Sequence, residues 1–155
     1  ARNEPEQALA DFDRILGRNP QSAQASYGRA YALSELPGQN LEAIESARQA
    51  LAADSGLLPA RCLLAVLLAR QSDFTGAVNL VEEALRSSPS GPVCYAAACV
   101  YALASREDNL HAEKSLKLLQ EALEQNYGWN DLSSDADLER IRQQPEFAKI
   151  LASQK

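Results

Sequence analysis

The sequence predicts an all-α protein built as an α-solenoid, a row of stacked helix–turn–helix units. The first observation is a repeat of about 34 residues, visible in the apolar phrases that start at Ala8, Ala43 and Ala77. A fixed period of this size is typical of solenoids. The second observation is that no stretch alternates apolar and polar residues for long enough to predict a β-strand. The third is that glycine and proline clusters separate the helical segments.

Equivalent ends of the repeats lie at Pro20, Ser55, Pro89 and Tyr127. They are 35, 34 and 38 residues apart, so the fourth repeat carries an insertion, which we place in a lengthened turn at 105–112. Because this turn holds few apolar residues, we expect it to be the most mobile internal connection. We expect seven repeat helices and two capping helices, at residues 5–18, 21–35, 41–53, 57–71, 74–87, 92–105, 112–125, 135–143 and 145–153.

Each helix is predicted from an apolar stripe and from signals at its ends. In segment 73–87 apolar residues recur at spacings of three and four, which places them on one face of a helix. Asp73 is a suitable N-cap for this helix and Asn40 for the helix at 41–53, while Pro5 suits a first helical position. The breakers between helices are Pro37-Gly38, Ser55-Gly56, Pro89-Ser90-Gly91-Pro92 and Tyr127-Gly128.

Small residues recur at equivalent places in the first helix of each repeat, at Ala30, Ala65 and Cys99. A larger side chain at these places would overpack the contact between paired helices. We therefore expect these three positions to lie where helices approach closely.

The segment from Leu58 to Pro89 carries a family resemblance. Its pattern consists of Leu64, Ala65, Leu68, Asp73, Phe74, Ala77, Val81, Ala84, Leu85 and Pro89. It resembles the tetratricopeptide repeat (TPR), a helix–turn–helix module of 34 residues. Arg61 and Ser26 stand where that family prefers a large aromatic residue, and Ser55 replaces its proline. The resemblance implies a right-handed α-solenoid with a half repeat at 1–20, full repeats at about 21–55, 56–89 and 90–128, and C-terminal capping helices at 129–155.

The C-terminal segment resembles the closing segment of many bacterial TPR regions, including some attached to Ser/Thr kinases. The resemblance lies in Gly128–Leu132, Asp135–Arg142 and Pro145–Leu151, with Ala136 in place of the usual proline. Ser134 and Asp137 have the spacing of a capping box, and Pro145 can open a new helix. An open solenoid needs a cap over its last apolar face, so we favour capping over a binding motif for this segment.

Composition limits the classes of function. The chain has 155 residues, 46% of them hydrophobic, which is enough for one domain with a core. The net charge of −6, with 15 scattered basic residues, argues against a nucleic-acid or acidic-membrane surface. The longest apolar run, Cys62–Ala69, is far shorter than the roughly 20 residues of a membrane span.

The residues that could support catalysis or metal binding are few. Cys62, Cys94 and Cys99 are read as buried free thiols, which predicts a reducing, cytoplasmic location. The single histidine, His111, lies among carboxylates in the predicted turn and is read as a solvated surface residue. No glycine-rich phosphate loop, nucleophile elbow or paired-cysteine zinc spacing is present. We therefore expect no catalytic residue, no metal and no cofactor.

The resemblance implies that the first helix of each repeat lines a concave groove. By register, the inner positions are Tyr27, Tyr31, Glu35, Cys62, Val66, Arg70, Ala96, Val100 and Leu103. Such an apolar groove suits an amphipathic helix or a hydrophobic peptide. Some members bind C-terminal carboxylates of chaperones through Lys and Asn at these positions, and this chain has neither there. The alternative is that upstream repeats or a second copy cover the groove.

Three functions remain open at this point. The favoured one is a non-catalytic scaffold that binds a protein or peptide partner. The second is a regulatory or dimerising C-terminal appendage of a larger enzyme such as a Ser/Thr kinase, and the third is an enzyme. We expect the chain to be a piece of a longer protein, because its first repeat lacks an opening helix. A homodimer through the open N-terminal end is a further expectation.

Overall fold

The computed structural model describes residues 4–106 and 108–153, and all the regular secondary structure in these ranges is helical. This confirms the prediction of an all-α helical repeat solenoid. The elements in order are α1 (Glu4–Arg18), α2 (Ala23–Ser34), α3 (Asn40–Ala53), α4 (Leu58–Arg70), α5 (Phe74–Ser87), α6 (Gly91–Ala104), α7 (Asn109–Glu124), the 3₁₀ turns η1 (Ala136–Leu138) and η2 (Ile141–Gln143), and α8 (Pro145–Ala152).

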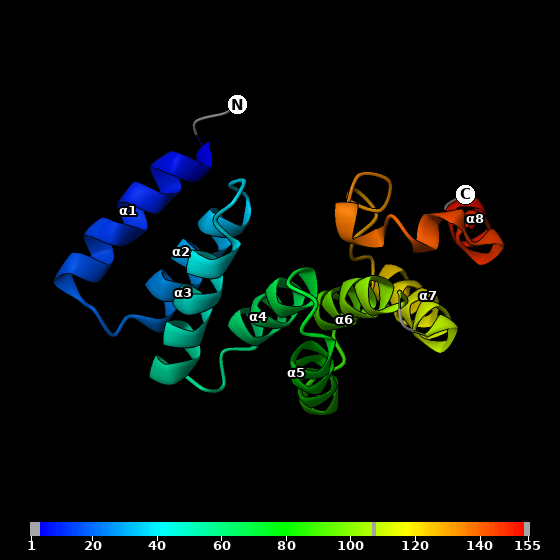
Figure 1. Cartoon of the computed structure of the whole chain (residues 1–155), viewed down its shortest axis with the longest axis horizontal. Coiled ribbons are helices and arrows are strands. Elements are labelled where there is room, and N and C mark those ends of the chain that lie inside the picture. The colour runs from blue at the N-terminus through cyan, green and yellow to red at the C-terminus, as the bar shows by residue number, and fades with distance from the viewer. Residues whose placement is uncertain (1–3, 107, 154–155) are drawn as a thin grey trace.

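The helices form an arc whose two ends rise on the same side (Figure 1). Helices α2 and α3, α4 and α5, and α6 and α7 pack as antiparallel pairs, and α4 packs directly on α6. Helix α1 packs on α2 as the second helix of an incomplete pair. At the other end the chain after α7 turns back over α6, through η1, before it reaches α8 (Figure 1). The hollow of the arc therefore lies between α2, α4, α6 and the returning segment.

Local sequence signals account for where helices begin and end. The Asp73 carboxylate accepts a hydrogen bond of 3.0 Å from the Gly76 N–H, which makes it the predicted N-cap of α5. Helix α4 ends where Ser72 adopts a left-handed conformation (φ 66°), and α7 ends in the same way at Asn126 (φ 58°). These positions allow the following N–H groups to bond back to the last turn of each helix.

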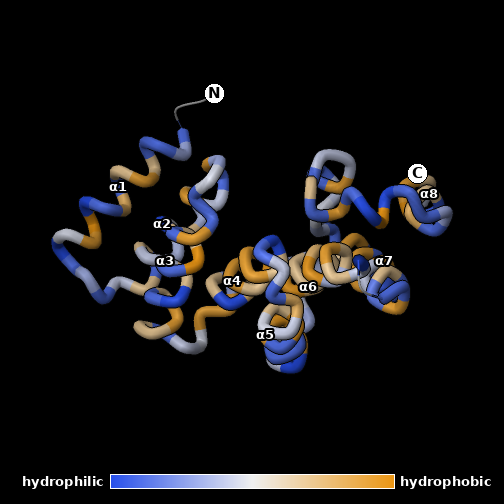
Figure 2. Tube along the Cα trace, viewed as in Figure 1, coloured by the Kyte–Doolittle hydropathy of each residue, from blue (hydrophilic) through white to orange (hydrophobic). Residues whose placement is uncertain are grey.

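The core runs along α4 and α6, the two most apolar helices (Figure 2). Ala30, Ala65 and Cys99 are all buried, with 0%, 0% and 3% of their surface exposed, as the prediction of close helix contacts requires. Helix α6 is covered by α4, α5 and α7 and by η1. No helix within the described residues is long and apolar enough to cross a membrane.

One N-cap prediction was wrong. Asn40 is the first residue of α3, and Gln39 precedes it as the cap residue. The Asn40 side-chain amide instead donates a hydrogen bond of 3.2 Å to the carbonyl oxygen of Leu67 in α4. The side chain thus links neighbouring repeats, because Asn40 lies within the helix and its amide N–H group faces α4.

The turn before α7 is shorter than predicted. Asp108 caps α7, and the helix starts at Asn109 rather than 112. The insertion therefore lengthens the helix, although part of the predicted mobile turn, residue 107, lies outside the described residues. His111 is helical and half-buried rather than solvated, with its ring 5.5 Å from the ring of Tyr101. Its Nδ1 lies 3.2 Å from the carbonyl oxygen of Ala104.

The C-terminal segment also differs from the prediction. Residues 135–143 form two 3₁₀ turns instead of a capping helix, and only α8 is helical as expected. Asp135, not Ser134, caps η1 by accepting a 2.9 Å hydrogen bond from the Asp137 N–H. Leu138 and Ile141 are fully buried against the core. Their spacing of three fits a 3₁₀ turn, in which residues i and i+3 share a face, as well as an α-helix.

Candidate functional site

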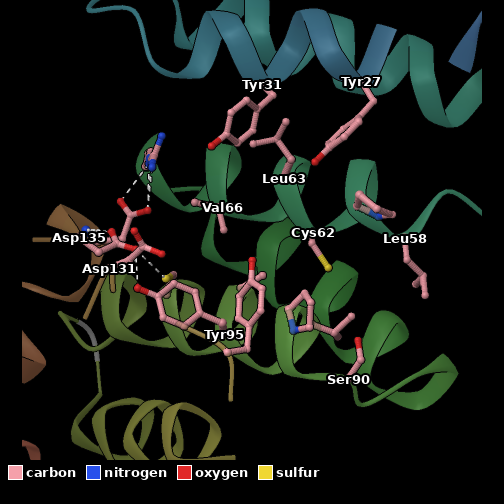
Figure 3. Close-up of a pocket in the computed structure, with 18 of the residues that line it drawn as sticks. Tyr27, Tyr31, Leu58, Cys62, Leu63, Val66, Ser90, Tyr95, Asp131 and Asp135 are labelled. Atoms are coloured by element: carbon pink, nitrogen blue, oxygen red, sulfur yellow. Dashed lines mark hydrogen bonds and ion pairs between the residues drawn. The ribbon is translucent and has the colours of Figure 1, made fainter. Parts of the chain in front are cut away.

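A cavity of about 700 Å³ occupies the hollow of the arc. Its walls come from α2, α4, α6 and the segment 127–137 (Figure 3). The lining residues are Tyr27, Tyr31, Glu35, Leu58, Pro59, Cys62, Leu63, Val66, Arg70, Ser90, Pro92, Val93, Tyr95, Ala96, Cys99, Tyr127, Asp131, Ser134, Asp135 and Asp137. We call this cavity the groove.

Helical spacing aims one face of each first helix into the groove. Tyr27 and Tyr31 are four residues apart on α2, and Cys62 and Val66 are four apart on α4, so each pair shares a helix face. Figure 3 shows the two tyrosines pointing from α2 toward Leu63 and Val66 on α4. Tyr31 is 55% exposed, so a large part of its side chain is open to a ligand in the groove.

The structure places seven of the nine predicted inner residues in the groove. They are Tyr27, Tyr31, Glu35, Cys62, Val66, Arg70 and Ala96. Val100 is fully buried in the core, and Leu103 packs partly buried against the same core, so neither lines the groove. The prediction was wrong for Val100 and Leu103 because the returning C-terminal segment covers part of α6. Tyr95 and Cys99 are the residues of α6 that line the groove instead.

Sequence reasoning missed one whole wall of the groove, because it treated the C-terminal segment as a cap alone. Tyr127, Asp131 and Ser134 line the groove from this segment. The chain enters it through Gly128, whose φ of +91° and close approach to the Tyr95 ring exclude a side chain: a Cβ there would lie 2.4 Å from the ring. The run of aspartates after Gly128 was the available signal.

Arg70 fastens this wall to α4. Its Nε lies 2.9 Å from Asp137 Oδ1 and its Nη2 lies 2.8 Å from Asp137 Oδ2, so the two side chains form a bidentate ion pair. The Asp137 side chain is 8% exposed and the Arg70 side chain 35%. Burial acts to lower the pKa of Arg70, but the hydrogen bond and charge of Asp137 outweigh it and raise the pKa. Arg70 is therefore a fixed cation whose charge is already neutralised.

Three further groups meet beside this ion pair. The Tyr95 hydroxyl donates a 3.0 Å hydrogen bond to Asp135 Oδ2, and the Cys99 thiol lies 3.7 Å from the same oxygen. The ligand atoms of Cys99, Asp135 and Asp137 lie within 4.8 Å of one another, a spacing that could suit a metal ion. However, the Arg70 guanidinium already supplies the cation, and burial raises the pKa of Cys99, which keeps the thiol protonated. We read this cluster as a structural network.

The Cys62 thiol and the tyrosine hydroxyls of the groove are neutral at physiological pH. Burial raises the pKa of Cys62 to about 11, so the thiol is a poor nucleophile. Burial likewise raises the pKa of Tyr27, Tyr31 and Tyr127. The Tyr127 ring packs edge-on against Tyr95, with 5.8 Å between the ring centroids. The groove thus presents tyrosine rings and hydroxyls beside the protonated Cys62 thiol.

Comparison with known protein families agrees with this architecture. A model of the tetratricopeptide repeat matches residues 1–58, 38–92 and 62–128, which together span most of the chain. The chain belongs to the tetratricopeptide repeat family. The matched stretches of this TPR protein include α1–α7, while η1, η2 and α8 lie beyond them.

Among solved structures, the TPR chain is similar to one described as a MamA RS-1 ArsTM double mutant. The TM-score is 0.65 at 18% sequence identity, over 99% of this chain and 89% of that one. At this identity the likeness shows the fold alone. A search of curated proteins finds no match.

Proposed function

We propose that this TPR protein is a non-catalytic scaffold that binds a segment of a partner protein in the groove. The observation that carries the proposal is the groove itself, which joins α2, α4 and α6 and keeps Tyr31 more than half exposed. Ligand sites in folded proteins are concave and lined mainly by apolar and aromatic side chains with a few polar groups, and tyrosine is enriched at protein interfaces. The Cys62 thiol is protonated and the Arg70 guanidinium is paired with Asp137, which favours a binding role over a catalytic one.

A helix or an extended segment suits the shape of this site. Tyr31 on α2 and Val66 on α4 occupy equivalent positions in successive repeats, and both line the groove. One ligand segment can therefore touch two repeats and the C-terminal wall together. The apolar surface supplies affinity, and the tyrosine hydroxyls supply hydrogen bonds that orient the ligand.

We further propose a cytoplasmic location. All three cysteines are free and buried. Free thiols persist in reducing compartments, whereas disulfides dominate in oxidising ones.

The test of the function uses two opposite charges at one position. Val66→Glu and Val66→Arg each place a charge in the apolar contact, and each should abolish binding of a partner segment, since burying an unpaired charge is costly. If the negative and the positive variant both lose binding, the apolar contact at Val66 is the cause and not the sign of the new charge. Leu41→Glu is the matched control, because Leu41 is 68% exposed outside the groove.

Circular dichroism of every variant shows whether the fold survives, as expected for the partly exposed Val66. Retained affinity in a folded Val66 variant would place the binding surface outside the groove. Unfolding of both variants would show that Val66 belongs to the core.

A further inference from the structure

The groove carries a strong imbalance of charge. Four carboxylates line it, and the guanidinium of Arg70 is the only basic group among its described lining residues. Asp137 forms an ion pair with Arg70, and Asp135 accepts a hydrogen bond from the Tyr95 hydroxyl. Glu35 and Asp131 remain, and within residues 4–106 and 108–153 neither carboxylate has a hydrogen bond or ion pair. Both are exposed to solvent.

These two carboxylates lie beside aromatic rings. Glu35 follows Tyr31 by one helical turn, and Asp131 follows Tyr127 by four residues in the opposite wall. Figure 3 shows Tyr31 and Asp131 on facing sides of the groove. After burial, the charges of Glu35, Tyr127 and Asp131 are the causes that raise the pKa of Tyr31, which agrees with their closeness. A cation attracted here would meet both negative charge and ring faces.

A carboxylate and a tyrosine ring bind a cation together at another place in the protein. The Lys114 ammonium lies 4.5 Å from the centre of the Tyr101 ring and 2.7 Å from the Glu82 carboxylate, and the Tyr101 hydroxyl donates to the same carboxylate at 2.6 Å. That lysine comes from the protein's own α7. In the groove the ring and the carboxylates are in place, and the described part of the chain supplies no free cation there.

We propose that the partner segment is a basic amphipathic one, in which a Lys or Arg among apolar residues is held by Glu35 and Asp131 against Tyr31 and Tyr127. The apolar residues of the segment cover Val66 and Leu63. This inference rests on the proposed binding function and specifies its ligand. One cation can contact a tyrosine face and a carboxylate together, and each contact is modest at an exposed site.

The experiment is a selection from a library of displayed random peptides of about 16 residues, a length that allows a helix to form. The wild-type protein is the bait, and the Val66→Arg variant removes peptides that bind outside the groove. We expect the groove-dependent peptides to share a Lys or Arg flanked by apolar residues. Groove-dependent peptides without enrichment of basic residues would overturn the cation site and leave the binding function intact. No groove-dependent peptide at all would overturn both.

A selected peptide then tests the two carboxylates. The Glu35→Gln/Asp131→Asn variant should bind it about tenfold more weakly, and the difference should shrink as salt is added. A version of the peptide with glutamine in place of its basic residue should bind both proteins equally. Equal affinity of the wild type and the double variant for the basic peptide would refute the assignment of Glu35 and Asp131. Replacing Glu45 with Gln is a matched control on the exposed surface of α3, outside the groove.

Discussion

The Arg70–Asp137 ion pair should hold the C-terminal segment on the solenoid, and Arg70→Met removes its charge while keeping an apolar stem. The Asp137 carboxylate would lose three hydrogen-bond contacts of 2.8–3.2 Å and stay almost fully buried. Breaking a buried ion pair from one side costs about 3–5 kcal/mol. Because 35% of the Arg70 side chain is exposed, water can replace part of the guanidinium, and we expect a loss of about 2 kcal/mol.

The assay is urea unfolding followed by circular dichroism, with the melting temperature as a second readout. A loss of this size should lower Tm by about 5 °C in a chain of this length. Arg61→Met is the control on the same helix: it removes a 3.3 Å ion pair with Glu83, whose side chain is 52% exposed, and a 2.7 Å hydrogen bond to the Ser55 carbonyl oxygen. Because its charged partner is solvated, the control should cost about 1 kcal/mol.

A double-mutant cycle isolates the pair itself. Asp137→Asn alone should also destabilise the fold, and the variant that combines it with Arg70→Met should lose less than the sum of the two, by about 1 kcal/mol or more. If Arg70→Met cost no more than Arg61→Met, or if the two changes were additive, the ion pair would not be what anchors the wall of the groove.

Three further predictions follow from single features. Gly128→Ala should destabilise the fold by about 2–3 kcal/mol, because the φ of Gly128 is +91° and an added Cβ would clash with the Tyr95 ring. Gly38→Ala is the control: Gly38 has a φ of +80° but open space around it, so the change should cost only about 1 kcal/mol. Equal losses of stability in thermal unfolding would contradict this prediction. Removing residues 129–155 should lower Tm and cause association in light scattering, because buried apolar residues of the core would be exposed; an unchanged monomeric protein would refute the capping role. Cys62 should react slowly with a thiol reagent at pH 7, and the rate should rise about tenfold per pH unit as the pH approaches its pKa of about 11. Mass spectrometry measures the extent of the reaction. A reaction at pH 7 as fast as that of free cysteine would contradict this prediction.

The repeat helices could be predicted because their signals are local. Apolar spacing and caps such as Asp73 specify each helix without reference to its neighbours. The small residues Ala65 and Cys99 were recognised because equivalent helices repeat the same packing. The spacing of Leu138 and Ile141 fits both an α-helix and a 3₁₀ turn, and this segment forms 3₁₀ turns.

The groove was predictable only where the repeats are equivalent. Extrapolation from Tyr31 and Val66 to Val100 failed, because the returning C-terminal segment packs on α6 through η1. That wall depends on contacts between residues far apart in the chain. Arg70 and Asp137 are 67 positions apart, and no pattern in one sequence pairs them. The capping pattern of the C-terminal segment does not indicate that Tyr127 and Asp131 also form a wall of the groove.

Photo-crosslinking shows whether a partner segment lies in the groove. The photoreactive residue benzoylphenylalanine replaces Tyr31, an exposed aromatic side chain in the groove, and in a second protein it replaces Leu41, which is exposed outside it. The probe is a peptide selected on the wild-type protein, at a concentration that saturates binding. We expect a crosslink from position 31 and none from position 41. Efficient crosslinking from position 41, with none from position 31, would place the bound segment outside the groove.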